Sequence, residues 1–437
     1  MKENYQRSLR ILCTLFLFNC SLTQAQLTVM ATGNFNVGGV SDNGIVSMHT
    51  SAGGIYKWDA TNGVVTIGAL TNGYPQAGRT VISKDGTRIA STITNGATNF
   101  NELATYNVAN LSWANHGGLV PTGWDGSVSS TWGMNSLGDI VVGLGWLTAA
   151  NGHAIKWTSE GGIVDLGSIV SGRSSRANAV NSDGTVIVGW QDQADGMRCG
   201  AKWINGVESF ILDGTGANVG EAGDVSADGN TIIGSAVPNP YVWNSVSGLT
   251  YITHPNSSAF FRGGATGISG NGGVVVGFYR PFPGAPMAGE GFIWTPAGGR
   301  VNLNDYAASL GITTNGVIMS LPLAISQDGK KIAGTGRDAS GQTVAFYLDL
   351  TQYLAVNENV NNENLLSIYP NPAKDNIYIK GKHKIEKAEI YNMVGQKLRT
   401  IPSVESQIDV SFLSKGNYVL HLFVKGEVSQ SFKFIKQ

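Results

Sequence analysis

A short pattern centred on a turn glycine recurs along most of this chain. Its clearest copy, residues 179–190, reads AVNSDGTVIVGW. Asp183 and Gly184 separate two runs of β-branched and apolar residues, which indicates a tight hairpin whose turn needs a positive φ. A loop and two further apolar runs, separated by an Asn-Gly turn, complete the copy by residue 212. One copy is therefore predicted to be a small antiparallel meander of four strands.

Six other segments follow the same pattern, and the turn glycines lie roughly 42 to 57 residues apart. This spacing is typical of a four-stranded propeller blade. The turn glycines are Gly44, Gly86, Gly138, Gly184, Gly229, Gly272 and Gly329. The third strand of most copies carries a large aromatic residue, which we expect to pack each sheet against the next. These residues are Trp58, Tyr106, Trp157, Trp203, Trp243 and Trp294. The pattern predicts an all-β, seven-bladed β-propeller over residues 26–350.

The composition agrees with this class. The chain has 437 residues, of which 59 are glycine and 14% are charged. Many glycines, few charges and no long helical periodicity favour an all-β protein with tight turns. The formal net charge of -1 favours neither nucleic acid nor an anionic membrane as a partner. Cys199 is the only cysteine after residue 25, so no intramolecular disulfide is expected and its thiol is interpreted as incidental.

The N-terminus has the pattern of a signal peptide. Basic residues precede the apolar run 11–18, and Ala25 supplies the small residue before a cleavage site. We therefore expect residues 1–25 to be removed and the mature chain to begin at Gln26. The apolar run is too short to span a bilayer, and no later segment comes near that length, so no transmembrane segment is expected. Lipoprotein processing at Cys20 is the alternative, but the residues before it match that pattern poorly.

The ends of the repeat array indicate how the ring closes. The seventh copy lacks a fourth strand, whereas residues 27–32 form a strand without a copy of their own. We expect this strand to complete the last blade, which would remove two open sheet edges. Residues 302–312, just before the seventh copy, are predicted to be a short helical insertion. Copies two and five depart most from the pattern.

Loop lengths indicate which face of the ring binds a ligand. The turns between the first and second strands, and between the third and fourth, are short and share one face. The longer connections share the other face, where functional residues are expected. Their aromatic, acidic and basic side chains suit the apolar C–H faces and hydroxyl edges of sugars. The candidate ligand-binding residues are Trp124, Asp125, Trp132, Trp146, Trp190, Asp192, Arg198, His254, Arg262, Tyr279 and Arg280.

Signatures of catalysis are weak. The histidines lack the spacing of metal ligands, and no serine elbow, Walker loop or zinc ribbon occurs. Carboxylates for glycoside hydrolysis could lie on the loop face, but a sequence cannot pair them across blades. Loop aromatics also have a second interpretation, because they often only cover the ends of blades. We expect a binding protein for a glycan or a protein ligand, with no metal and no cofactor. The alternatives are a polysaccharide-degrading hydrolase or lyase, and a structural interaction platform.

The C-terminal part of the chain has a different pattern. Residues 351–364 are polar and rich in asparagine, which indicates a linker. Residues 365–437 have alternating apolar residues suited to a small β-sandwich. This tail resembles the C-terminal sorting domain of the type IX secretion system of Bacteroidetes. The residues that carry the resemblance are Pro370, Asn371, Pro372, Gly395, Gly416, Tyr418, Lys433 and Lys436.

The resemblance implies export through the periplasm and across the outer membrane, with the type IX secretion machinery as a partner. It also implies that the tail is removed and that the protein is then attached to the cell surface or released. On this interpretation the tail directs export, and the propeller carries the function of the protein.

The propeller copies are similar to the HAF repeats of secreted bacterial proteins. In that family a hairpin of the form G-I-S-x-D-G-x-V-V-G precedes an A-F-x-W strand and a G-x-x-x-L-G strand. Residues 153–157, HAIKW, and residues 162–167, GIVDLG, match the last two elements closely. The resemblance implies a fold but no established activity.

Overall fold

The computed structural model describes residues 27–351, 366–381, 385–392, 397–404, 406–424 and 430–437. Its contacts divide the chain into two compact units, Met1–Leu354 and Ala355–Gln437. The predicted signal peptide lies outside the described residues, and so does the predicted linker apart from residue 351.

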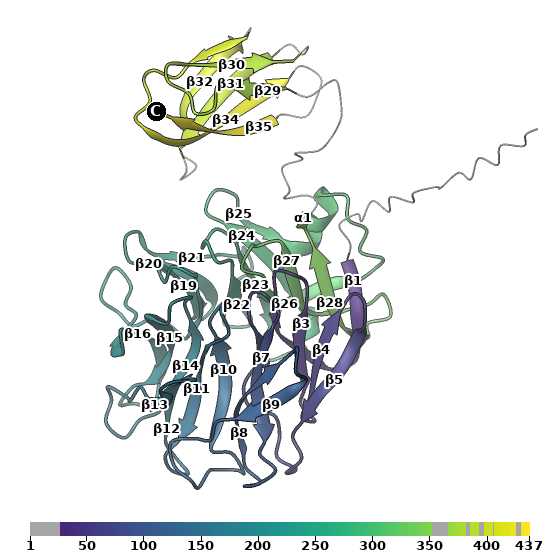
Figure 1. Ribbon diagram of the computed structural model, residues 1–437, viewed down its shortest axis with the longest axis vertical. Helices are drawn as coiled ribbons and strands as arrows, with labels where there is room; N and C mark the ends of the chain where they lie inside the picture. Colours follow the sequence, from purple (N-terminus) through teal and green to yellow (C-terminus); the bar gives the residue numbers. More distant parts are fainter. Residues whose placement is uncertain (1–26, 352–365, 382–384, 393–396, 405, 425–429) are drawn as a thin grey trace, which may run out of the picture. The chain divides into compact units, whose positions relative to one another are not determined.

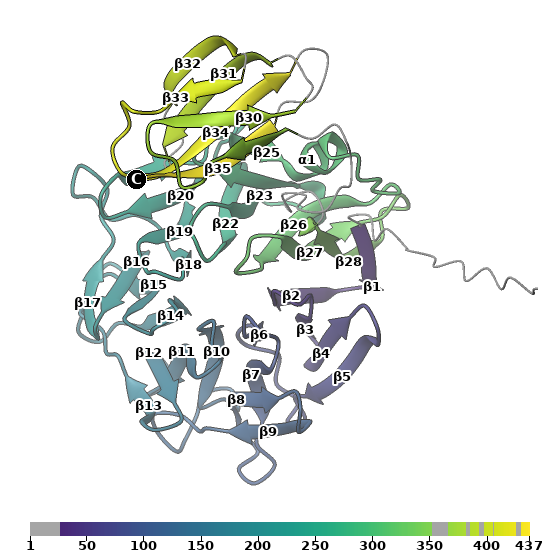
Figure 2. The same cartoon turned by 45° about the horizontal axis from the view of Figure 1, so that its top comes forward.

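Seven four-stranded sheets make up the first unit, and they are arranged in a ring (Figures 1 and 2). Blades 1 to 4 comprise β2 (Phe35–Val40), β3 (Val46–Thr50), β4 (Gly54–Asp59) and β5 (Gly63–Ala69); β6 (Val81–Ile82), β7 (Arg88–Thr94), β8 (Asn101–Asn107) and β9 (Ser112–Asn115); β10 (Ser129–Met134), β11 (Ile140–Trp146), β12 (Gly152–Thr158) and β13 (Gly162–Asp165); and β14 (Ser175–Val180), β15 (Val186–Asp192), β16 (Arg198–Ile204) and β17 (Val207–Phe210).

Blades 5 to 7 comprise β18 (Ala222–Val225), β19 (Thr231–Ala236), β20 (Asn239–Asn244) and β21 (Gly248–Tyr251); β22 (Phe261–Ile268), β23 (Val275–Pro281), β24 (Glu290–Thr295) and β25 (Gly299–Asn302); and β26 (Ile318–Ile325), β27 (Lys331–Arg337) and β28 (Thr343–Asp349) with β1 (Leu27–Thr32). A 3-10 helix, η1 (Pro286–Ala288), lies between β23 and β24. The predicted seven-bladed propeller is confirmed. Blades 2 and 5, whose sequences fit the pattern least, have the shortest first strands.

The turn glycines adopt the backbone that the pattern predicts. All seven have φ between +70° and +86°, a region that only glycine enters without strain. In the clearest copy, Asp183 Oδ1 accepts hydrogen bonds from the backbone N of Thr185 at 2.9 Å and from its Oγ1 at 2.6 Å. These hydrogen bonds lower the pKa of the Asp183 carboxyl. The Asp-Gly pair therefore shapes the hairpin.

A bulge recurs in the first strand of the blades. In six blades the pairing of the first two strands shifts register at the residue six positions before the turn glycine. A bulge adds one residue to a strand and turns its side chain in a new direction. Trp132, Asn178 and Thr266 occupy this position, and all three line a cavity on the axis of the ring. The bulge thus decides which side chains face inward.

Aromatic residues of the third strands pack neighbouring blades together, as predicted. Trp58 of blade 1 lies against Tyr347 of blade 7, with ring centroids 5.0 Å apart. Trp203 is fully buried among residues of blades 3 and 4, and its indole N donates a hydrogen bond to the Leu166 carbonyl at 3.2 Å. The aromatic residue therefore supplies both an apolar contact and a hydrogen bond between neighbouring blades.

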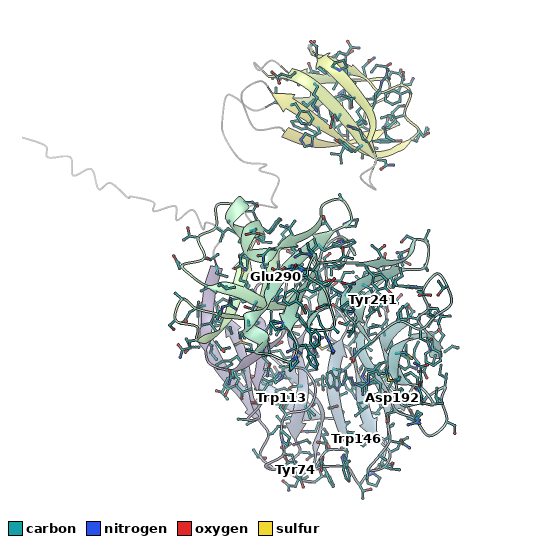
Figure 3. All side chains as sticks on the ribbon, turned by 180° about the vertical axis from the view of Figure 1, so that it is seen from behind. Tyr74, Trp113, Trp146, Asp192, Tyr241 and Glu290 are labelled. Atoms are coloured by element: carbon teal, nitrogen blue, oxygen red, sulfur yellow. The ribbon has the colours of Figure 1, made fainter. Side chains whose placement is uncertain are left out.

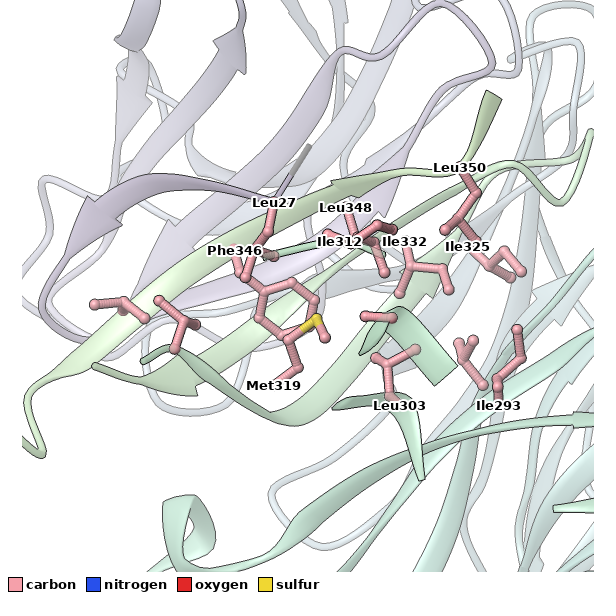
Figure 4. Close-up of a cluster of buried hydrophobic side chains, with 14 residues drawn as sticks. Leu27, Ile293, Leu303, Ile312, Met319, Ile325, Ile332, Phe346, Leu348 and Leu350 are labelled. Atoms are coloured by element: carbon pink, nitrogen blue, oxygen red, sulfur yellow. The ribbon is translucent and has the colours of Figure 1, made fainter. Parts of the chain in front are cut away.

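The N-terminal strand closes the ring, as predicted. β1 pairs antiparallel with β28, from Leu27 opposite Leu348 to Thr32 opposite Val344. Leu27 lies in a buried cluster with Phe346 and Leu348 (Figure 4). The last blade therefore combines three strands from one end of the propeller sequence with one strand from the other.

The predicted helical insertion is also confirmed, as α1 (Leu303–Ser309). The Asn302 side chain caps its first turn by accepting a hydrogen bond from the Asn304 backbone N at 2.9 Å. Leu303 joins the cluster that holds the closing strand, so the insertion supports ring closure.

The second unit is a small β-sandwich, as predicted. One sheet contains β29 (Ser367–Tyr369), β30 (Asn376–Lys380) and β33 (Gln407–Asp409), and the other contains β32 (Lys397–Val404), β31 (Ile385–Asn392), β34 (Gly416–Val424) and β35 (Gln430–Lys436). Apolar side chains from both sheets form one core, which includes Ile377, Ile390 and Phe434. Leu366, directly before β29, is buried in the same core.

We expect deletion of β1, residues 27–32, to destabilise the propeller. The deletion removes the buried side chains of Leu27 and Met30 and exposes the edge of β28. Burial of two such side chains is worth about 3 to 6 kcal/mol, so the thermal midpoint should fall by roughly 5 °C or more. Calorimetry of the mature chain measures this.

The matched control is an equal deletion inside the predicted linker, residues 356–361. It should leave the propeller midpoint unchanged. Equal midpoints for the two deletions would contradict closure of the ring by β1.

Candidate functional site

Most of the candidate ligand-binding residues lie on strands, and the prediction that they lie in loops is wrong for these. The residues on strands are Trp132, Trp146, Trp190, Asp192, Arg198, Arg262, Tyr279 and Arg280. Antiparallel pairing continues further than the sequence pattern indicates, for example to Asp192 opposite Arg198 in the β15–β16 hairpin. Trp124, Asp125 and His254 lie between strands.

Five of the candidate residues line one cavity of about 360 Å³ at blades 3 and 4, which we call the blade 3–4 cavity. Binding sites for small ligands have volumes of about 300 to 1,000 Å³, so this cavity is at the small end of that range. Figure 3 labels two of its residues, Trp146 and Asp192. The lining consists of Ala77, Ser130, Trp132, Leu144, Trp146, Ala149, Ala150, Ser174, Arg176, Trp190, Asp192 and Arg198.

Two arginines and two tryptophans are stacked in the wall of this cavity. The guanidinium carbon of Arg176 lies 3.4 Å from the ring centroid of Trp132 and 5.1 Å from that of Trp190. The guanidinium carbon of Arg198 lies 3.6 Å from the Trp190 centroid. A guanidinium over an indole ring is attracted by the negative face of the ring, most strongly where water is excluded. The stack therefore gives the cavity a wall in which two guanidinium groups are held against indole rings.

Carboxylates hold the two arginines in place. Arg176 Nη2 lies 2.6 Å from Glu221 Oε1, and Asn178 Nδ2 donates to the same oxygen at 2.8 Å. Burial lowers the pKa of Arg176 to about 10, against the opposing effect of Glu221, so the guanidinium is still charged at neutral pH. Arg198 is more exposed, and its Nε lies 3.4 Å from Asp192 Oδ1.

Trp146 and Trp190 have different surroundings. Trp190 is only 4% exposed, so the prediction that it is an exposed aromatic platform is wrong. Two arginines lie against its indole ring, and its Nε1 is buried without a hydrogen-bond partner among the described residues. Trp146 is half-buried, and no ring or cation in the described part of the chain stacks on it. Trp146 is thus the tryptophan in this lining on which no other ring or cation of the described residues is stacked.

A second group of candidate residues is satisfied internally in blade 6. His254 Nε2 lies 3.2 Å from Glu290 Oε1, which is also 2.7 Å from Arg300 Nη1. Tyr279 is fully buried, and its hydroxyl donates to the Ile252 carbonyl at 2.5 Å. Burial lowers the pKa of His254, helped by Arg300 and opposed by Glu290. These contacts anchor the β21–β22 connection to the blade.

The remaining candidates are separate from both groups. Arg262 lies over the Phe282 ring at 3.9 Å, and Arg280 lies 5.8 Å from the Phe278 centroid. Trp124 is 42% exposed and sits in a tight turn in which Asp125 has φ +47°. The structure brings none of Trp124, Asp125, Arg262 and Arg280 to the lining of the blade 3–4 cavity.

Sequence reasoning missed Arg176 and Glu221. Both stand eight positions before the turn glycine of their blade, Gly184 for the first and Gly229 for the second. Equivalent positions in neighbouring blades lie side by side in a propeller, so opposite charges there predict an ion pair. Alignment of the copies on their glycines contains this signal.

Burial shifts the pKa of several other titratable groups among the described residues. Burial lowers the pKa of His49 and of His116 to about 4, so both are neutral near pH 7. Burial also raises the pKa of the Cys199 thiol to about 11. Within the described ranges no group of three or more His, Cys, Asp and Glu side chains could hold a metal ion. No described helix is long and apolar enough to cross a membrane.

Comparison with known proteins identifies the tail. Residues 367–437 match the secretion system C-terminal sorting domain. The sequence has no significant match among curated proteins. Among solved structures, a chain of the mitotic checkpoint complex is similar at 15% identity and a TM-score of 0.46, over 78% of this chain and 98% of that chain. An oligogalacturonate lyase in complex with manganese is similar at 12% identity and a TM-score of 0.42, over 75% and 93%. TolB from Acinetobacter baumannii is similar at 12% identity and a TM-score of 0.39, over 72% and 78%.

The sorting-domain match indicates that the protein is exported to the cell surface or secreted, and that its tail interacts with the type IX secretion machinery. At the identities above, the likeness to solved structures concerns the fold alone. The resemblance of the propeller to HAF repeats and the assignment to Bacteroidetes stay predictions.

The stack predicts different stabilities for two tryptophan variants. Trp190→Ala empties a buried site and removes the ring between two guanidinium groups, so it should cost about 3 to 5 kcal/mol of the free energy of unfolding. Trp146→Ala, in the same cavity but at a side chain that is only partly buried and outside the stack, should cost less, about 1 kcal/mol. Thermal melts of the two variants compare them. Equal midpoints would show that the stack does not hold blades 3 and 4 together.

Proposed function

We propose that the propeller is a binding module of an exported protein, and that it takes a glycan in the blade 3–4 cavity. The observation that carries this proposal is the place of Trp146 in the cavity lining, with no ring or cation of the described residues stacked on it, beside the wall of Trp132 and Arg176. A sugar ring stacks its apolar C–H face on an indole, while charged groups bond its hydroxyl edges. Asp192 and Arg198 stand in the same lining and can supply those bonds.

The geometry favours binding over hydrolysis. Glycoside hydrolysis uses two carboxyl groups that flank the scissile bond, one of which donates a proton. Glu221 Oε1 is already occupied by Arg176 and Asn178, and Asp192 lies next to Arg198. The two carboxylates nearest the cavity therefore hold its wall together. A polysaccharide-degrading enzyme and a platform for another surface protein remain as outcomes of the test below.

For the tail we propose that the sorting signal combines the Pro370-Asn371-Pro372 segment with the last strand. Asn371 Oδ1 accepts a hydrogen bond from the Ile435 backbone N at 2.9 Å, and the Gln437 backbone N donates to the Ala373 carbonyl at 2.9 Å. These bonds support one recognition element formed from the two ends of the domain.

The structure describes most of the other predicted residues of the sorting signal. The Tyr418 hydroxyl donates to the Ser414 carbonyl at 2.8 Å, and Lys436 Nζ donates to the Gln437 carbonyl at 2.7 Å. Gly416 begins β34. Gly395 and the side chain of Lys433 lie outside the described residues.

Binding should depend on Trp146. In a glycan-array screen of the mature chain, we expect one class of glycan to bind, and Trp146→Ala to raise its Kd about tenfold by removing the stacking surface, a loss of about 1.4 kcal/mol. Trp124→Ala is the matched control, because Trp124 is an exposed tryptophan outside the cavity, and it should leave Kd unchanged. Binding lost in Trp124→Ala and kept in Trp146→Ala would place the site elsewhere. Release of reducing ends or unsaturated products from a bound polymer would show that the propeller is an enzyme, which would contradict the proposed binding function.

Delivery beyond the periplasm should depend on the tail. A chain truncated after Leu350 keeps every propeller strand, and Leu350 itself is buried in the blade 7 core. We expect this chain to fold but to stay in the periplasm, whereas the full chain reaches the cell surface or the medium. Cell fractionation and protease accessibility measure its location. A truncated chain that still reached the surface would refute the sorting role of the tail.

A further inference from the structure

The ring holds a second cavity on its axis, with a volume of about 100 Å³. The first strands of all seven blades, or the residues next to them, contribute to its lining, and Figure 2 shows these strands facing the centre of the ring. We call it the axial cavity. A water molecule takes about 30 Å³ in the liquid, so the axial cavity suits roughly three waters or a molecule with few non-hydrogen atoms.

One carboxylate faces this cavity where the other blades have small or apolar side chains. Asp224 stands five positions before the turn glycine of blade 5. The other blades have Gly39, Val81, Gly133, Ala179, Gly267 and Ala324 at this position. The Asp224 carboxylate is held by the backbone N of Val225 at 2.9 Å and of Ile268 at 3.1 Å. Burial raises its pKa to about 6, although these hydrogen bonds and Arg79 oppose the rise. The group is therefore mostly ionised at pH 7.5.

One guanidinium faces the same cavity from another blade. Arg79 stands seven positions before the turn glycine of blade 2. The other blades have Val37, Thr131, Ala177, Ala222, Ala265 and Pro322 at this position. The Arg79 backbone N donates to the Thr131 carbonyl at 2.7 Å. Across the described chain, no carboxylate oxygen lies within 4.0 Å of its guanidinium. Lys84 also borders the cavity, but its ammonium group is largely exposed and lies 3.8 Å from Asp42.

Two opposite charges thus border the axial cavity, and both side chains are only partly buried. Arg79 and Asp224 are not in contact, because no ion pair joins them, and the five other blades fill the same positions without charge. Charged residues at positions that are uncharged in the other blades mark a candidate functional site.

We propose that the axial cavity binds a small zwitterion, with the carboxylate of the ligand on Arg79 and its ammonium group on Asp224. A guanidinium and a carboxylate on the walls of one small cavity match the two charges of such a molecule. The free amino acids and short ω-amino acids form the chemical class that fits this charge pattern and this volume. The proposal goes beyond glycan binding and does not depend on it.

A series of ω-amino acids tests the proposal and measures the span between the two charges. Glycine, β-alanine and γ-aminobutyrate carry the same charges at increasing separation, and a ligand that binds only the folded state raises the thermal midpoint with concentration. We expect at least one of the three to give a saturable rise for the mature chain. Acetate and methylammonium, each with a single charge and used at equal ionic strength, should give none.

Variants assign the effect to the axial cavity. Arg79→Met keeps the length of the side chain without its charge, and Asp224→Asn keeps an oxygen that can accept a backbone hydrogen bond. Each should raise the Kd of the preferred zwitterion at least tenfold in calorimetric titration. If Asp224→Asn does not fold, Asp224→Glu replaces it, and this variant should shift the preference toward a shorter zwitterion.

Three results would overturn the proposal: no saturable rise with any of the three zwitterions, an equal rise with acetate alone, or variants that bind as tightly as the natural chain. Glycan binding by Arg79→Met serves as the independent readout. It should be unchanged, since Arg79 is not in the lining of the blade 3–4 cavity. A failure of the axial site is thereby distinguished from a failure of the glycan site.

Discussion

The antiparallel pairing of β1 with β28 is the contact on which the ring depends, because each blade otherwise touches only its neighbours. Without it, the edge of β28 in blade 7 would be unpaired. Hydrogen bonds on the short-turn face close the ring a second time. The Asp42 backbone N donates to the Lys84 carbonyl at 2.8 Å, which joins blades 1 and 2. The Asp328 backbone N donates to Asp42 Oδ1 at 2.9 Å, which joins blade 7 back to blade 1.

A closed ring fixes the register of every first strand relative to its turn glycine, and this register decides what faces inward. The bulge six positions before the glycine directs Trp132 and Asn178 toward the axis. The neighbouring positions place Arg79 and Asp224 on the same axial cavity. Because the backbone repeats, a given position of the copies has the same location in every blade. The side chains that differ between copies at that position therefore determine the chemistry found there.

The sequence predicts the fold well because the repeat carries the information many times. Blade count, hairpin turns, the closing strand and the helical insertion each follow from local patterns that need no partner to be recognised. The site is predicted only in part. Trp146 and Asp192 are found because they are conspicuous near long connections, whereas Arg176 is missed because its role depends on Trp132 and Glu221 in other blades. Burial of Trp190 could not be read from its neighbours in sequence, since the arginines above and below it come from β14 and β16.

The arrangement around Arg176 explains why the blade 3–4 cavity can keep its shape without a ligand. Its guanidinium lies on the Trp132 ring of blade 3 and bonds Glu221, directly before blade 5, while its own backbone belongs to blade 4. One side chain thus links three successive blades, and ring closure prevents those blades from separating. Arg176 and Arg198 lie against the Trp190 ring, whereas no ring or cation of the described residues stacks on Trp146. A ligand that stacks on Trp146 therefore meets a wall that is already ordered, and a preorganised wall loses little conformational entropy when the ligand binds.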